Sequence, residues 1–99
     1  MPGLLWRSNS FTLSPATGDI GEVYSGIEAG LPGLGYTEIT KQQDDVLGVK
    51  GDFFVVVAYL HRGGRDFDRL VMLAFDGSPD AAKAEIGTVI KKIDELTSL

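Results

Sequence analysis

The sequence has 99 residues, a hydrophobic fraction of 43% and a formal net charge of −5. This length suits one hydrophobic core, so we expect a single domain over residues 1–99. The hydrophobic fraction is too high, and the net charge too small, for a disordered chain. Neither nucleic acid nor a membrane is an expected partner, because the chain is acidic and has no run of Lys or Arg that would bind phosphates.

The sequence contains no cysteine. This excludes disulfides, thiol nucleophiles and thiolate metal sites, and it fits a reducing compartment. The N-terminal residues lack the basic segment and long apolar stretch of a secretory signal. The longest apolar run, residues 53–60, is far shorter than the roughly 20 residues of a membrane-spanning helix. We therefore expect a cytoplasmic protein.

In chain order, the first predicted element is a strand over residues 4–13, whose polar middle is typical of a sheet edge. The pair Ser14-Pro15 places a capping residue before a proline at the first helical position, so a helix is expected to begin there. Apolar residues recur at helical spacing as far as Leu31. Gly30 and Pro32 end this predicted helix.

The pattern then becomes that of strands, up to a second helix near the end of the chain. Four strand-like segments occupy residues 36–41, 46–50, 53–61 and 66–75. The Gly63-Gly64 pair between the last two is typical of a hairpin turn. Ser78-Pro79 opens the second helix in the same way as the first, and apolar residues at helical spacing continue to Leu96.

These elements predict an α+β fold in two layers. We expect an antiparallel sheet of four to five strands with two helices on one face, in the order β-α-β-β-β-α with room for one more strand. The turn at Gly63-Gly64 places His61 opposite Asp66 in the central hairpin. In this register the helices cover the face that carries Phe54, Val56, Leu60, Phe67, Val71, Leu73 and Phe75.

The opposite face of the hairpin is also apolar, whereas a half-exposed antiparallel strand should alternate. Its candidate interface residues are Phe53, Val55, Val57, Leu70 and Met72. The rest of the chain has little apolar material left once both helices are used. We therefore expect a homodimer, in which the sheets pack face to face or join edge to edge. The alternatives are a bound ligand and helices on both faces.

The same face ends in a polar cluster near the turn. The candidate ligand-binding residues are Tyr59, His61, Asp66, Asp68 and Met72. A carboxylate beside an imidazole can orient it as a general base, but the same pattern is typical of a solvated pair at a hairpin tip. No nucleophile motif or phosphate loop accompanies the cluster. We assign no catalytic residue, no metal ligand and no cofactor.

The leading interpretation is a non-enzymatic homodimeric module that binds a protein or peptide with its uncovered sheet face or an edge strand. In layout and acidic charge the chain resembles secretion-chaperone-like proteins, which bind extended segments of their partners. This resemblance implies no site residue. The alternative is a small-molecule-binding domain or small enzyme with a pocket at the polar end of the hairpin. Trp6 is expected to be a core or interface anchor.

Overall fold

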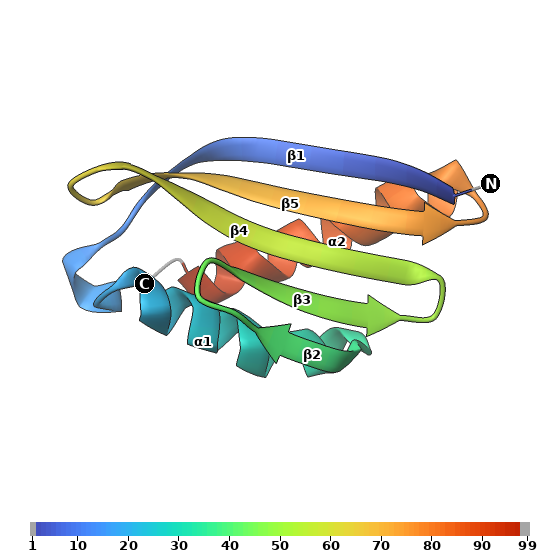
Figure 1. The fold of residues 1–99 in the computed structure, drawn as a ribbon, viewed down its shortest axis with the longest axis horizontal. Coiled ribbons are helices and arrows are strands. Elements are labelled where there is room, and N and C mark those ends of the chain that lie inside the picture. Colours follow the sequence, from blue (N-terminus) through green and yellow to red (C-terminus); the bar gives the residue numbers. More distant parts are fainter. Residues whose placement is uncertain (1, 98–99) are drawn as a thin grey trace.

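The structure, a computed structural model, describes residues 2–97. The strands are β1 (Pro2–Thr12), β2 (Thr37–Lys41), β3 (Asp45–Lys50), β4 (Phe53–Gly63) and β5 (Asp66–Asp76), and the helices are α1 (Ile20–Gly30) and α2 (Pro79–Thr97). The strands form one antiparallel sheet in the order β1-β5-β4-β3-β2. Both helices lie on the same face of this sheet (Figure 1). The predicted α+β class and two-layer arrangement are confirmed, with five strands.

Helix α1 begins later than the Ser-Pro pair predicts. Pro15–Thr17 forms only a short 3₁₀ helix, and Gly18 follows with φ of 89°. That backbone conformation suits glycine and interrupts the helix. Helix α1 then begins at Ile20, where the Asp19 carboxylate accepts a hydrogen bond from the Glu22 N–H at 2.9 Å. Asp19 therefore caps the helix in place of the predicted serine.

The other predicted helix boundaries are confirmed. Helix α1 ends at Gly30 and passes into the 3₁₀ helix Leu31–Leu34, which Gly35 ends with a left-handed φ of 94°. Helix α2 begins at Pro79 after Ser78, whose hydroxyl accepts a hydrogen bond from the Ala81 N–H at 3.3 Å. This is the cap expected of a serine before a helical proline. None of the helices within residues 2–97 combines the length and apolarity needed to cross a membrane.

The predicted register of the central hairpin is wrong by one residue. His61 pairs with Phe67 rather than with Asp66, and the register shifts between His61 and Gly63. Arg62 is therefore an extra residue in β4, and the turn falls at Gly64-Arg65. Both strands are apolar on both faces, so the hydrophobic pattern alone does not distinguish the two registers.

Contacts of Arg65 account for the position of the turn. The Leu13 N–H donates a hydrogen bond to the Arg65 carbonyl at 2.8 Å, and the Arg65 Nε donates to the Leu13 carbonyl at 2.6 Å. The guanidinium also donates to the carbonyls of Ser14 and Gly18, at 2.6 and 3.0 Å. Arg65 thereby holds the segment between β1 and α1 against the hairpin turn, which requires Arg65 to lie in the turn.

The hydrophobic core lies between the sheet and the two helices. In the observed register Val55 pairs with Leu73 and Val57 pairs with Val71, and none of these side chains is more than 1% exposed. The helices contribute the buried residues Val23, Tyr24, Ile27, Ala82, Ile86, Val89 and Ile93. One face of the sheet is therefore buried in the core.

Candidate functional site

The face of the sheet opposite the helices has no cover among residues 2–97, and we call it the open face. Alternation along each strand places on it Leu4, Trp6, Leu47, Val49, Phe54, Val56, Ala58, Leu60, Leu70, Met72 and Ala74. Leu4 and Trp6 on β1 are 59% and 58% exposed, and Phe54 on β4 is 41% exposed. Trp6 pairs with Met72, which in turn pairs with Val56. These pairs form a continuous apolar strip across three strands.

The predicted interface residues are divided between the two faces. Leu70 and Met72 lie on the open face, half-buried by their neighbours. Val55 and Val57 are 0% exposed and lie beneath the helices, and Phe53 packs against the same core. The one-residue register offset is the reason, because it exchanges the faces of every β4 side chain relative to β5.

Three residues predicted to face the helices lie on the other side of the sheet. Phe54, Val56 and Leu60 lie on the open face, and Leu60 is 57% exposed. Their partners on β5 are the open-face residues 74, 72 and 68. The predicted apolar face on the side away from the helices is therefore present. It carries other β4 residues than those predicted.

The candidate ligand-binding residues are likewise divided. Tyr59 and His61 lie on the helix-covered face of β4, whereas Asp66, Asp68 and Met72 lie on the open face of β5. The predicted pairing of His61 with Asp66 does not form. The sheet thus separates the imidazole from both carboxylates.

Each polar member of that set has a local contact instead. The His61 Nε2 lies 2.9 Å from the Gly64 carbonyl, and its ring packs against Phe67 with centroids 4.9 Å apart. The Asp66 carboxylate accepts a hydrogen bond from the Thr12 hydroxyl at 2.9 Å. Asp68 forms an exposed ion pair with Arg62 at 3.4 Å. These contacts stabilise the end of the hairpin, and they assemble no catalytic group.

A cavity of about 600 Å³ opens where β4 extends past the end of β3, between α1 and the β2–β3 turn. We call it the hairpin-end pocket. Its aromatic wall is formed by Tyr24, Tyr59 and Phe67, and Asp44 and His61 are the ionisable residues besides the two tyrosines. A pocket of this size and largely apolar lining is typical of small-molecule sites. Two of the candidate ligand-binding residues, Tyr59 and His61, therefore do line a pocket.

The two tyrosines of this pocket have raised pKa values. Burial raises the pKa of Tyr24, and the negative charges of Asp44 and Asp45 raise it further. Burial also raises the pKa of Tyr59 to about 12, against the lowering effect of the nearby Arg69 guanidinium. The Tyr59 hydroxyl is buried and has no hydrogen-bond partner among the described residues. Both side chains are protonated at neutral pH, so neither is a ready general base.

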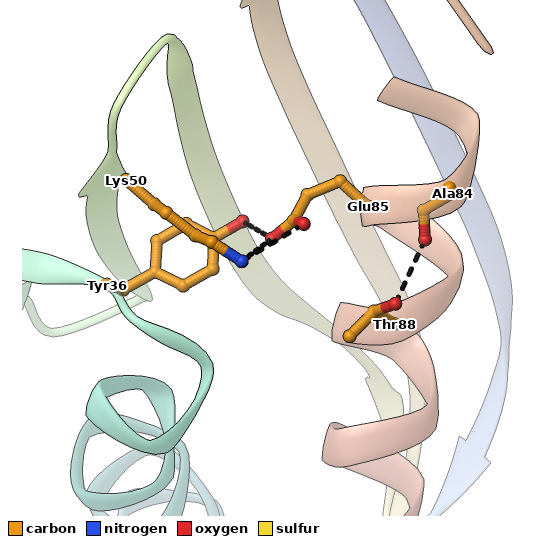
Figure 2. A network of polar contacts seen from close by, with 5 residues as sticks. All are labelled: Tyr36, Lys50, Ala84, Glu85 and Thr88. Carbon is orange, nitrogen blue, oxygen red and sulfur yellow. Dashed lines mark hydrogen bonds and ion pairs between the residues drawn. The ribbon is translucent and has the colours of Figure 1, made fainter. Parts of the chain in front are cut away.

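A second polar network joins α2 to the far end of the sheet. Figure 2 shows Tyr36 and Lys50 converging on Glu85 of α2. The Tyr36 hydroxyl donates to Glu85 Oε2 at 2.8 Å, and the Lys50 Nζ lies 3.1 and 3.2 Å from the two carboxylate oxygens. Burial, reinforced by Glu85, raises the pKa of Tyr36 far above its usual value. These groups satisfy one another, which is the pattern of a structural anchor.

Arg69 is a further buried polar residue that sequence reasoning did not single out as a contact. It is 4% exposed, and it donates hydrogen bonds to Asp94 of α2 at 2.5 Å and to Asn9 of β1 at 3.1 Å. It therefore connects α2 to both strands at one edge of the sheet. Among residues 2–97 no group of three His, Asp or Glu side chains is placed to hold a metal ion.

The sequence did not indicate several residues that form the open face and the hairpin-end pocket. The sequence pattern includes Leu4 in the first strand without giving it a role, and it predicts Leu60 beneath the helices. Tyr24 falls within the helical spacing that ends at Leu31, and Asp44 falls between the predicted strands 36–41 and 46–50, so neither is indicated as a site residue. The signal that could identify Asp44 is its position in a turn at the same end of the sheet as the hairpin tip. No protein-family model matches the chain, and no curated protein matches it at a significant level.

Proposed function

We propose that this chain is a non-enzymatic binding or assembly module that forms a homodimer through its open face. The observation that carries the proposal is the exposure of Leu4, Trp6 and Phe54 on an apolar surface that no described residue covers. Contiguous apolar patches on soluble domains mark interaction sites, because leaving them in water costs free energy. Aromatic residues such as Trp6 and Phe54 are typical anchors of protein interfaces.

The size of the open face suits a stable dimer. Strands β1, β4 and β5 have 11 residues each. At about 3.3 Å per residue they extend about 35 Å, and five strands about 4.8 Å apart extend about 20 Å. The resulting outline of roughly 700 Å² is close to the roughly 800 Å² that each partner buries in a standard interface.

A second copy suits this surface because a two-fold interface joins the same patch of both subunits, so each would offer its apolar strip to the other. Two such sheets pack about 10 Å apart, as in a β-sandwich, and interdigitate their side chains. The acidic end of the face is partly neutralised by the ion pair of Asp68 with Arg62. Strand β1 is also a sheet edge, so its outer backbone groups can pair with an extended segment of a partner. A cytoplasmic location, expected from the lack of cysteine, belongs to the same proposal.

Sedimentation velocity over a range of concentrations tests the dimer. We expect the parent protein to sediment as a dimer at micromolar concentrations and Trp6→Lys to sediment as a folded monomer, because Trp6 is exposed and supports little of the core. The matched control is Ala84→Lys, which adds the same charge on an exposed position of α2. Emission of Trp6, the sole tryptophan, should shift to shorter wavelength on association. A monomeric parent protein at high micromolar concentration would overturn the proposal.

A second candidate function is small-molecule binding in the hairpin-end pocket. The specific observation in its favour is the cavity of about 600 Å³ lined by Tyr24, Tyr59, Phe67 and His61. Its largely apolar wall with a few polar groups is the composition expected of a ligand site. This function is compatible with the dimer, because the aromatic wall belongs to the helix-covered side of the sheet.

A further inference from the structure

The aromatic wall of the hairpin-end pocket has a defined geometry. The ring of Tyr59 lies between those of Tyr24 and Phe67, with centroid distances of 5.6 and 6.5 Å. The planes meet at 76° and 86°, so each pair of rings packs edge to face, and all three rings line the pocket. Each ring face carries negative electrostatic potential. An aromatic lining therefore attracts a cation more strongly than a neutral group of the same shape.

The ionisable groups around the pocket add to this negative potential. Asp44 lines it, and no Lys or Arg is among its lining residues in the described part of the chain. Asp45 follows directly, and its Oδ1 is buried with no hydrogen-bond donor among residues 2–97. Both carboxylates raise the pKa of Tyr24. Charge and aromatic rings therefore favour the same kind of ligand.

The remaining lining residues provide room for an apolar body. Ile20 of α1 and Leu60 of β4 are the aliphatic residues, and Leu60 is 57% exposed. The Gln43 amide and the His61 ring are the polar residues besides Asp44. The cationic side chains near these residues have other partners. Arg69, which acts on Tyr59, is paired with Asp94, and Lys41 donates to the Ser25 hydroxyl. Arg65 is bonded to three backbone carbonyls, and Arg62 pairs with Asp68. An anionic ligand would thus find few donors here.

We propose that the hairpin-end pocket binds a small organic cation, a protonated or quaternary amine with an apolar body. The cation lies against the rings of Tyr24, Tyr59 and Phe67, and the carboxylate of Asp44 balances its charge. This inference rests on the small-molecule function proposed above and specifies its ligand class. The dimer uses the open face, which shares only Leu60 with the lining of this pocket.

A titration followed by ¹H–¹⁵N correlation NMR tests the proposal with two probes. Choline carries a quaternary ammonium, and dimethylbutanol is its uncharged isostere, with carbon in place of nitrogen. We expect choline to shift the amide signals of Asp44, Leu60 and His61 with a Kd on the order of 1 mM, as suits a ligand of few atoms. Dimethylbutanol should bind at least about fivefold more weakly.

Two variants locate the interaction. Asp44→Asn removes the charge but keeps the backbone carbonyl that accepts the Tyr24 hydroxyl, and it should weaken choline binding several-fold. The matched control is Asp52→Asn, an exposed aspartate in the β3–β4 turn at the other end of the sheet, which should leave choline binding unchanged. Phe67→Leu removes one ring and should weaken choline more than dimethylbutanol. Its folding is checked by circular dichroism.

The outcomes separate this inference from the proposal on which it rests. Stronger binding of choline that depends on Asp44 supports the organic-cation site. Equal affinities for the two probes would show a pocket that accepts apolar molecules without regard to charge, which overturns the inference and leaves the small-molecule function standing. No shift of pocket signals with either probe at 50-fold the expected Kd would overturn both.

Discussion

The Tyr24 hydroxyl takes the place of a missing strand partner for Tyr59. It accepts a hydrogen bond from the Tyr59 N–H at 2.8 Å, and it donates to the Asp44 carbonyl at 2.7 Å. Pairing between β3 and β4 ends at Asp45 and Ala58, so Tyr59 is the first residue of β4 with no strand on that side. A side chain of α1 therefore satisfies the buried backbone of β4 at the point where the hairpin-end pocket begins.

Replacing Tyr24 by Phe should destabilise the fold. The variant Tyr24→Phe keeps the ring but leaves the buried Tyr59 N–H without its partner, which costs about 1–3 kcal/mol of unfolding free energy. Urea unfolding measures this loss. The control Ser25→Ala removes an exposed contact with Lys41 and should change stability by less than about 0.5 kcal/mol. A Tyr24→Phe protein as stable as the parent would contradict the assigned role.

Stability should fall at alkaline pH because all three tyrosines have raised pKa values. Tyr59 titrates at about 12 in the folded chain and near 10 when unfolded, so the folded state holds the proton more tightly. The contribution of this proton binding to the free energy of unfolding is complete below pH 10, and it is lost as the pH rises through 12. The loss from Tyr59 amounts to about 2–3 kcal/mol.

This pH dependence is measured as the unfolding free energy between pH 8 and 12, together with tyrosinate absorbance. Lysines deprotonate in the same range, so the comparison with Tyr59→Phe isolates the share of one side chain. The slope of stability against pH should be smaller in the variant. Parallel curves for the two proteins would refute the contribution of Tyr59.

Arg65→Lys should loosen the connection between β1 and α1. Lysine keeps the charge but has no planar fork, so it cannot reproduce the bonds to the carbonyls of Leu13, Ser14 and Gly18. We expect a loss of about 1–3 kcal/mol in unfolding free energy and faster hydrogen exchange at residues 13–18. Arg62→Lys, which alters only an exposed ion pair, is the control. Unchanged exchange at residues 13–18 in Arg65→Lys would argue against this role.

Much of the architecture could be read from local signals. Gly30 and Pro32 mark the end of α1, and Ser78-Pro79 marks the start of α2, because capping and φ restriction act within a few residues. The first Ser-Pro pair shows the limit of such signals. A glycine at position 18 with positive φ interrupts the helix, and Asp19 provides the cap that the pattern assigned to Ser14.

The candidate sites depended on information that local patterns do not carry. A polar end of the hairpin was expected at Tyr59 and His61, and both residues do line the hairpin-end pocket. Asp44 and Tyr24 join them from a distant turn and from α1, so only the packing of α1 against the sheet brings the pocket together. The separation of His61 from Asp66 has the same origin, because it follows from the turn position that Arg65 holds.

The sequence by itself determined the class of fold, the order of its elements and the presence of more apolar strand surface than two helices can cover. Those properties follow from composition and periodicity, which each segment carries alone. Only the tertiary structure decided which β4 side chains form the open face. Val55 and Val57 are buried and Phe54 and Leu60 are exposed because one extra residue at Arg62 shifts the register. Both strands are apolar on both faces, so contacts with β1 and the helices, and not the hydrophobic pattern, select the register.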